Sequence, residues 1–186
     1  CGPISLIVAY RFPKSSIVGI EKNNIHYNLA LRNKEENDFI NLEYFNKDIS
    51  QFYSQFDNYF DLILTNPPFF FENTVIKSSN LSIRDAKYIT KKKLDLWFHS
   101  LFKYLSPLGK AYIINRYENL GYMRSFFSKM LCELTITPLL SFKGCKPKNV
   151  LISIKKNEKY VEKIENDFII HTKSSEYSKD TKNWFK

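Results

Sequence analysis

The pattern of apolar and polar positions along the first part of the chain predicts short strands between helices. Residues 4–11 are apolar and follow Pro3, a residue that the first turn of a helix tolerates. Residues 16–21 (SIVGIE) are rich in β-branched side chains and predict a strand. Asn23 can cap a second helix, which we expect to run to about Glu36.

Two further strands are predicted before a long segment without a clear pattern. Residues 42–48 alternate, with Leu42 and Tyr44 on one face. Residues 60–65 contain the run Leu-Ile-Leu, which is apolar on both faces and typical of a central parallel strand. The segment over 66–87 that follows is predicted to be mostly irregular.

The second half of the chain predicts one long amphipathic helix and a closing pair of strands. Apolar residues recur every three or four positions over 94–105, and Pro107 with Gly109 would end this helix. A strand over 111–115 and a helix over 120–131 follow. Residues 134–142 and 149–154 predict a pair of antiparallel strands joined by a basic loop. Residues 157–167 predict a solvated turn, residues 168–171 an edge strand, and residues 172–186 a polar end.

Strands that alternate with helices predict an open α/β sheet, here with an antiparallel hairpin at its end. The 186 residues, 44% of them hydrophobic, suit one globular domain. No run of 18 apolar residues and no signal peptide is visible, so no membrane partner is expected. Three cysteines and three histidines without ligand spacing predict neither a disulfide framework nor a metal site. We expect a cytoplasmic monomer.

Charge is the strongest signal in the composition. Lys and Arg number 28 against 19 Asp and Glu, which gives a formal net charge of +9. A basic protein is drawn to polyanions, and nucleic acid is the usual one. A lysine-rich composition that only keeps the protein in solution is the alternative explanation.

Polar residues follow three predicted strands at the edge where open α/β sheets bind their ligands. These residues are Glu21, Asp48 and Asn66. One carboxylate can accept both hydroxyls of a ribose, a second can accept an exocyclic amine, and an asparagine offers an acceptor and donors. Together they could hold a nucleoside-like cofactor and present a second amine to it.

The loop after the third of these strands reads Asn66-Pro67-Pro68-Phe69. Pro67 and Pro68 lack N–H groups, so they fix the loop and leave its carbonyl groups free to accept hydrogen bonds. Phe69 supplies a face on which a planar ring can stack. A plain proline turn is the alternative.

This motif resembles the Asn/Asp-Pro-Pro-aromatic motif of S-adenosylmethionine-dependent amino-methyltransferases. Further segments fall in the order seen in the bacterial tRNA1(Val) adenine-37 N6-methyltransferase family: CGPISLIVAYRFP, SIVGIE, NKDIS, IRDAKYIT, LSPLGKAYIIN, KPKNVLISI and EYSKD. The resemblance covers nearly the whole chain. It implies a Rossmann-like class I methyltransferase sheet, and N6-methylation of an adenine, at position 37 of valine tRNA, as a step of tRNA processing.

The resemblance also implies a cofactor site. Gly2 would be the last glycine of the loop around the methionine part of S-adenosylmethionine. Glu21 would hold its ribose, and Asp48 with Ile49 would hold its adenine. The resemblance also places Asn66 among the cofactor contacts.

On the substrate side, the resemblance implies that Asn66 and the carbonyl of Pro67 accept hydrogen bonds from the target amine. This orients the lone pair of the nitrogen, without a covalent intermediate. Pro68 completes the rigid turn, and Phe69 would stack on the extruded base. RNA phosphates would be contacted by four basic residues: Arg84, Lys87, Lys91 and Lys146.

The family pattern further implies a strand and more glycines ahead of Cys1. That first strand would be central in the sheet, between the strands of Val18 and Ile63. We therefore expect residues 1–186 to be a single methyltransferase domain that is truncated at the N-terminus, and slightly at the C-terminus after Tyr177. Such a chain alone would bind the cofactor weakly and could be inactive.

The methyl acceptor has alternatives, because the same motif serves guanine-N2 methyltransferases of ribosomal RNA and glutamine-N5 methyltransferases of release factors. Phe69 and the net charge of +9 favour a nucleic-acid base. A third hypothesis is a non-catalytic RNA-binding module, which would leave Asn66 idle.

Overall fold

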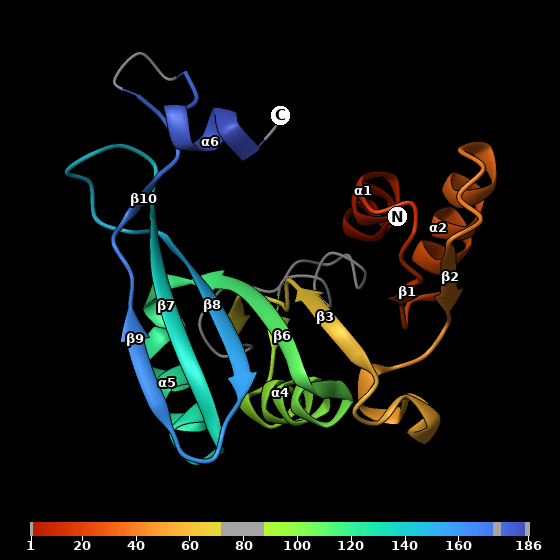
Figure 1. Ribbon diagram of the computed structural model, residues 1–186, viewed down its shortest axis with the longest axis horizontal. Coiled ribbons are helices and arrows are strands. Elements are labelled where there is room, and N and C mark those ends of the chain that lie inside the picture. Colours follow the sequence, from red (N-terminus) through yellow and green to blue (C-terminus); the bar gives the residue numbers. More distant parts are fainter. Residues whose placement is uncertain (1, 72–87, 173–175, 185–186) are drawn as a thin grey trace. The chain divides into compact units, whose positions relative to one another are not determined.

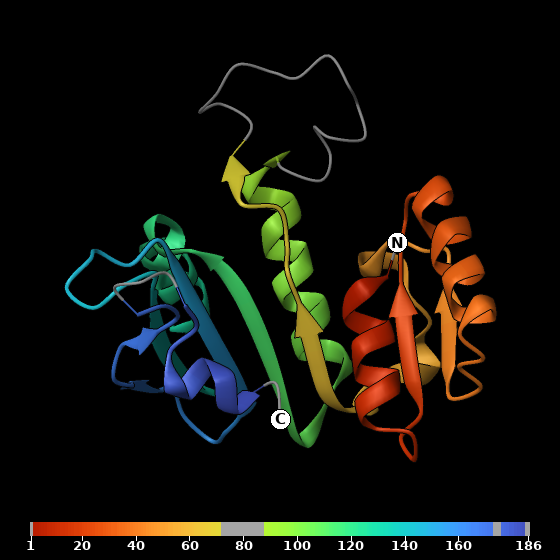
Figure 2. The same ribbon diagram turned by 90° about the horizontal axis from the view of Figure 1, so that it is seen from above.

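The computed structural model of the chain describes residues 2–71, 88–172 and 176–184 (Figures 1 and 2). The chain forms two compact units, unit 1 (Cys1–Phe56) and unit 2 (Asp57–Lys186), which are described separately below. Strands alternate with helices in both units, which confirms the α/β prediction. The prediction of one domain, truncated at its ends, stays a prediction.

Unit 1 pairs two short parallel strands, each preceded by a helix. Its elements are α1 (Pro3–Arg11), β1 (Ile17–Ile20), α2 (Asn24–Glu36), β2 (Leu42–Phe45) and the short 3-10 turns η1 (Ile49–Gln51) and η2 (Ser54–Phe56). β1 and β2 are in register with Ile17 opposite Leu42. The side chain of Asn23 accepts hydrogen bonds from two backbone N–H groups in the first turn of α2, which confirms the predicted cap.

The small core of unit 1 closes around the ring of Tyr44, which lies against two glycines. A Cβ atom added at Gly19 would lie 2.3 Å from ring atoms of Tyr44. Gly2 has a φ of +63°, in the left-handed region, and a Cβ atom there would meet the Tyr44 hydroxyl. This hydroxyl donates a hydrogen bond to the Gly2 carbonyl at 3.2 Å, and burial raises the pKa of Tyr44. Both glycines are therefore required by packing.

Unit 2 is built on one mixed sheet with the strand order β10-β7-β8-β6-β3, and β9 also pairs with β7. The strands are β3 (Phe60–Thr65), β6 (Leu105–Arg116), β7 (Cys132–Leu140), β8 (Asn149–Lys156), β9 (Val161–Ile164) and β10 (Phe168–Ile169). Figure 1 shows β9 and β10 following one another along the outer side of β7. β3 is parallel to β6, and β8 is antiparallel to both β6 and β7. The carboxyl ends of β3, β6 and β7 therefore share one edge of this sheet.

The described helices of unit 2 include two that contact each other through aromatic side chains. The helices are α4 (Lys91–Tyr104), α5 (Leu120–Phe127) and α6 (Lys179–Trp184), with the 3-10 turn η3 (Tyr117–Asn119) ahead of α5 and a small parallel pair, β4 (Phe70–Phe71) and β5 (Tyr88–Ile89). Leu94, Phe98 and Leu101 of α4 are buried, which confirms the predicted apolar stripe. Phe98 contacts Phe127 of α5, with ring centroids 5.0 Å apart. Figure 2 shows α4 beside β3.

The predicted range of the long helix ends within one residue of the observed end, but the expected role of Pro107 and Gly109 in ending it is wrong. α4 ends at Tyr104, and Pro107 and Gly109 lie inside β6, which already begins at Leu105. The pairing of β3 with β6 shifts in register after Phe60, and this irregularity accommodates the proline. Gly109 passes so close to β3 that an added Cβ atom would lie 2.7 Å from the Phe60 carbonyl oxygen.

The prediction of a solvated turn over residues 157–167 is also wrong, because β9 forms there and pairs in parallel with β7. β9 has polar side chains because it lies at an edge of the sheet. Glu162 forms an ion pair with Arg124 at 2.6 Å, and Lys163 forms one with Glu133 at 2.8 Å. The helix predicted over 120–131 ends earlier, at Phe127.

The apolar run of β3 is typical of a central strand, and within unit 2 β3 lies at the end of the strand order. Leu62 and Leu64 are 44% and 40% exposed. In the described part of this unit, β6 is the strand that pairs with β3, so one edge of β3 carries no neighbour. The predicted position of a further strand between Val18 and Ile63 stays a prediction.

The close contact at Gly19 yields a stability test. We expect Gly19→Ala to lower the free energy of unfolding by about 1–3 kcal/mol, because the added methyl group would overlap the buried Tyr44 ring. Gly121→Ala is the matched control, since nothing lies within 4 Å of its Cβ position and α5 should gain about 0.5–1 kcal/mol. Urea unfolding measures both, and equal midpoints for the two variants would contradict the packing described here.

Candidate active site

Two of the predicted site residues, Glu21 and Asp48, follow β1 and β2 at the carboxyl edge of the sheet in unit 1. The strand ends are joined by a hydrogen bond from the Glu21 backbone nitrogen to the Phe45 carbonyl, at 3.0 Å. The side-chain amide of Asn46 donates to the Glu21 carbonyl at 2.8 Å. The structure therefore brings these two residues to one edge, as the sequence predicts.

The two carboxylates differ in what they already bind. Oε1 of Glu21 accepts a hydrogen bond from the Asn23 backbone nitrogen at 2.9 Å, and Oε2 has no partner among the residues that the structure describes. Oδ1 of Asp48 accepts from the backbone nitrogen and the hydroxyl of Ser50, at 3.0 and 2.7 Å, and so caps η1, which begins at Ile49. Glu21 thus keeps an oxygen that can accept a ligand hydroxyl.

Gly2 occupies the N-cap position of α1 in the left-handed conformation. Its structural role against Tyr44 explains the glycine by packing alone. The same geometry leaves the backbone of the turn without a side chain, which is what a close approach by a ligand requires. Packing and ligand approach thus favour the same residue type at Gly2.

The motif Asn66-Pro67-Pro68-Phe69 leaves β3 at the carboxyl edge of the sheet in unit 2. Asn66 is exposed, Pro67 is buried, and Pro68 and Phe69 are half-buried. The preceding residue, Thr65, accepts a hydrogen bond from the Trp97 indole nitrogen at 3.1 Å, which fixes the end of β3 to α4. A buried proline and an anchored strand end thus present a solvent-accessible amide.

A pair of asparagines that sequence reasoning missed connects this motif to the end of β6. The side-chain nitrogen of Asn119 donates to the carbonyl of Phe69 at 2.7 Å and to Oδ1 of Asn115 at 2.8 Å. Asn115 is fully buried, and its Oδ1 also accepts from the Arg116 backbone nitrogen at 2.8 Å. Single asparagines after a strand carry no distinctive signal, so only the three-dimensional contact to Phe69 reveals them.

The predicted RNA-contacting residues have different surroundings. Lys91 begins α4, and its Nζ lies 5.6 Å from the ring centre of Tyr122. Lys146 is exposed in the loop after β7, at the edge that also carries Asn66. Arg84 and Lys87 lie outside the described residues.

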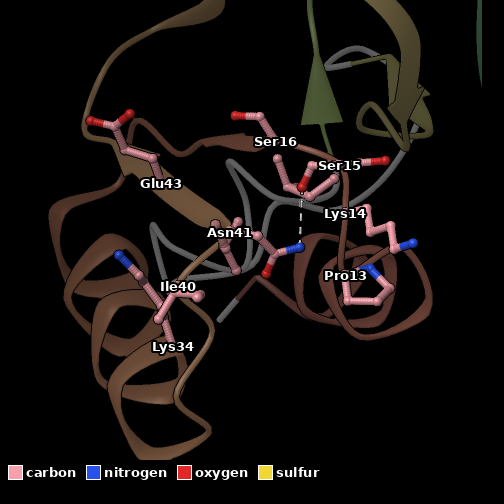
Figure 3. Close-up of a pocket in the computed structure, with 10 residues that line it drawn as sticks. Pro13, Lys14, Ser15, Ser16, Lys34, Ile40, Asn41 and Glu43 are labelled. Atoms are coloured by element: carbon pink, nitrogen blue, oxygen red, sulfur yellow. Dashed lines mark hydrogen bonds between the residues drawn. The ribbon is translucent and has the colours of Figure 1, made fainter.

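A hollow in unit 1 lies at the other end of β1 and β2, away from Glu21 and Asp48 (Figure 3). The amide of Asn41 points into its wall and donates to the carbonyl oxygens of Ala9, Phe12 and Ser15, at 3.1–3.2 Å. These bonds tie the end of α1 to β2. Because the side-chain nitrogen of Asn41 is used in these bonds and the residue lies at the amino ends of the strands, we assign it a structural role.

In the part of the chain that the structure describes, no group of three His, Cys, Asp or Glu side chains could hold a metal ion. None of the described helices is long and apolar enough to cross a membrane.

Comparison with known proteins identifies similar chains. The family model of the methyltransferase small domain matches residues 1–98. Two tRNA1(Val) (adenine(37)-N6)-methyltransferases, from Histophilus somni strains 2336 and 129Pt, are 26% identical over 187 residues, which cover 97% of this chain and 75% of theirs.

Solved structures show the fold. A predicted O-methyltransferase from Agrobacterium tumefaciens superposes with a TM-score of 0.76 at 15% identity and covers 98% of this chain and 82% of its own. A TehB-like SAM-dependent methyltransferase from Corynebacterium glutamicum gives a TM-score of 0.55 at 15% identity, over 83% of this chain and 74% of its own. These similarities confirm the predicted methyltransferase fold.

Proposed function

This chain belongs to the methyltransferase small domain family, and we propose that it uses S-adenosylmethionine to methylate the N6 amine of an adenine in tRNA. The observation that supports the proposal most directly is the exposed amide of Asn66 after β3, beside a buried proline and a half-buried phenylalanine. The names of the Histophilus somni relatives support tRNA as the substrate and position 37 of valine tRNA as the target.

The amine site consists of two acceptors on one rigid turn. Oδ1 of Asn66 and the carbonyl of Pro67 accept hydrogen bonds from the two N–H groups of the adenine amine. This takes the nitrogen lone pair out of conjugation with the ring and orients it for attack. Phe69 stacks on the extruded base, and Pro68 keeps the turn rigid. As the new N–C bond forms, the bond from the methyl group to the sulfonium sulfur breaks, its electron pair stays on the sulfur, and the amine nitrogen loses one proton to water.

The cofactor side of the proposal uses residues of unit 1, with Asn66 as an additional contact. Bound S-adenosylmethionine supplies a methyl group activated by the positive charge of its sulfonium. The free carboxylate oxygen of Glu21 fits a ribose hydroxyl, because it lies at a strand end and has no other described partner. We assign the adenine to Asp48 and Ile49, at the start of η1, and the methionine part to the turn at Gly2.

Removal of the Glu21 carboxylate tests this assignment. We expect Glu21→Ala in the full-length protein to weaken S-adenosylmethionine binding about 10-fold or more, since a hydrogen bond to a charged group is worth about 1.5–3 kcal/mol. Glu43→Ala removes an exposed carboxylate from the neighbouring strand β2 and is the matched control. Isothermal titration calorimetry measures both affinities. Equal affinity of Glu21→Ala and wild type would remove Glu21 from the site.

The choice of methyl acceptor is tested by offering several. The full-length protein is incubated with labelled S-adenosylmethionine and, separately, total tRNA, ribosomal RNA or release factor. Label in tRNA that nucleoside analysis identifies as N6-methyladenine supports the proposal. Label confined to ribosomal RNA or to protein would overturn it, and RNA binding without any label would favour a binding module.

The proposal takes tRNA as the partner of a monomeric cytoplasmic enzyme that needs no metal. The net charge of +9 supports the binding of a polyanion. We assign phosphate contacts to four basic residues, Arg84, Lys87, Lys91 and Lys146. Such contacts position the RNA without reading its sequence.

A further inference from the structure

The sheet of unit 2 carries a second group of exposed residues at the edge where Asn66 lies. β3, β6 and β7 end at this edge, and the loop over 141–148 connects β7 to β8 there. The backbone nitrogen of Tyr117, just after β6, donates to the Lys148 carbonyl at 2.9 Å. The loop is therefore tied to the segment that leads to Asn119, which holds the Phe69 carbonyl.

The loop is basic and its charges are available. Lys143, Lys146 and Lys148 are exposed, and none of them forms an ion pair with an acidic residue in the described ranges. The loop itself (SFKGCKPK) contains no acidic residue. Lysines on one short loop that have no acidic partner among the described residues create a local positive potential that favours phosphate groups.

A row of aromatic rings adjoins this loop. His171 follows β10, and its backbone nitrogen donates to the Ser141 carbonyl at 2.9 Å. Its ring stacks on Tyr177 with centroids 5.2 Å apart and an interplanar angle of 17°, and it contacts Phe142 at 5.8 Å. Tyr177 is 48% exposed, so the row ends in a ring that offers surface to solvent.

We propose that this lysine–aromatic surface (Phe142, Lys143, Lys146, Lys148, His171 and Tyr177) binds an unpaired stretch of RNA, with Tyr177 stacking on a base and the lysines contacting phosphates. The inference rests on the proposed function and gives the tRNA a second contact, separate from the methylated base. Aromatic faces combined with flanking cations are how proteins hold single-stranded nucleic acid. An acidic protein would use the lysines alone, and the exposed ring would have no role.

The lysines and the Tyr177 ring are tested separately in the full-length protein. Fluorescence anisotropy with a labelled anticodon stem-loop measures the affinity for RNA. We expect the triple variant Lys143→Ser/Lys146→Ser/Lys148→Ser to bind at least about 10-fold more weakly and to reduce the slope of log affinity against log salt by about 2. Tyr177→Ser should weaken binding about 5- to 100-fold, and Tyr177→Phe should bind like wild type, because stacking needs the ring and not the hydroxyl.

Matched controls come from the opposite edge of the same sheet. Lys159→Ser removes an exposed lysine in the turn between β8 and β9, and Tyr59→Ser removes a 56% exposed ring just before β3. Both should bind RNA like wild type. If either control weakens binding as much as its counterpart, charge or aromatic content in general explains the effect and the inference fails.

Cys145 allows a direct footprint of the loop. Cys145 is exposed in the middle of the loop, whereas Cys132 is buried and its burial raises its thiol pKa to about 11. In a full-length background in which every cysteine other than Cys132 and Cys145 is replaced by serine, maleimide should therefore label Cys145 selectively. We expect saturating RNA to slow this labelling about 10-fold, because the thiol reacts only in protein that has no RNA bound.

The outcomes separate this inference from the proposed function. Unchanged affinity of Tyr177→Ser, or unprotected Cys145 at saturating RNA, overturns the surface even if tRNA is methylated. If polyglutamate displaces the RNA and Tyr177→Ser binds RNA with wild-type affinity, the loop would be reassigned to an acidic protein partner. This result would also overturn the inference. Loop-dependent RNA binding without tRNA methylation would support the surface and overturn the proposed function.

Discussion

Replacing Asn66 by alanine is expected to lower kcat for methyl transfer to tRNA about 100- to 1,000-fold, while the affinity for tRNA stays within about twofold of wild type. The variant removes the side-chain acceptor that orients the amine, and the carbonyl of Pro67 remains. Because Asn66 is exposed, its loss costs little packing energy. Single-turnover methylation with labelled S-adenosylmethionine measures the chemical step directly.

Asn166→Ala provides the comparison for this variant. Asn166 is also exposed and lies between β9 and β10, so it loses the same atoms without touching the motif. Its kcat should equal that of wild type. An Asn66→Ala enzyme with more than about a tenth of the wild-type kcat would show that the amide is not the main acceptor.

Asn119→Leu is expected to lower kcat about 10- to 100-fold without changing the affinity for S-adenosylmethionine, although Asn119 has no place in the amine site. The variant keeps most of the side-chain volume and removes the donor that holds the Phe69 carbonyl. It also leaves Asn115 Oδ1 with one donor fewer, at a cost of about 1–3 kcal/mol in stability. We interpret Asn119 as a positioning residue for the loop.

A double-mutant cycle distinguishes positioning from a general loss of stability. If Asn119 acts through the loop, Asn119→Leu should have little further effect on kcat in an Asn66→Ala background. If it acts only on stability, the two effects on kcat should multiply. Urea unfolding of the single variants, run in parallel, shows whether the protein is folded under the assay conditions.

The sequence predicted the elements whose local signals agree with their surroundings. The cap at Asn23 and the stripe of Leu94, Phe98 and Leu101 belong to helices that bury one face, so pattern and packing coincide. The predicted ends of β1 and β2 are close to the observed ones, so Glu21 and Asp48 lie at one edge of the sheet, as predicted. The roles assigned to these residues came from the family resemblance and stay predictions.

The errors arise where tertiary contacts outweigh local preference. Pro107 and Gly109 signal the end of a helix, and they lie in β6 because the irregular pairing with β3 admits them. β9 is polar because it is an edge strand, so no apolar pattern marks it. The link from Asn119 to Phe69 spans 50 residues, and no local pattern reports such a contact.

The antiparallel direction of β8 affects which parts of such a protein can vary in sequence during evolution. Because β8 returns antiparallel beside β6 and β7, the loop over 141–148 is a hairpin connection. Lengthening a surface connection of this kind costs little free energy and leaves the pairing of the strands unchanged. The loop can therefore diverge toward other RNAs while β3 and its asparagine stay fixed. Substrate choice and methyl transfer can evolve separately within one sheet.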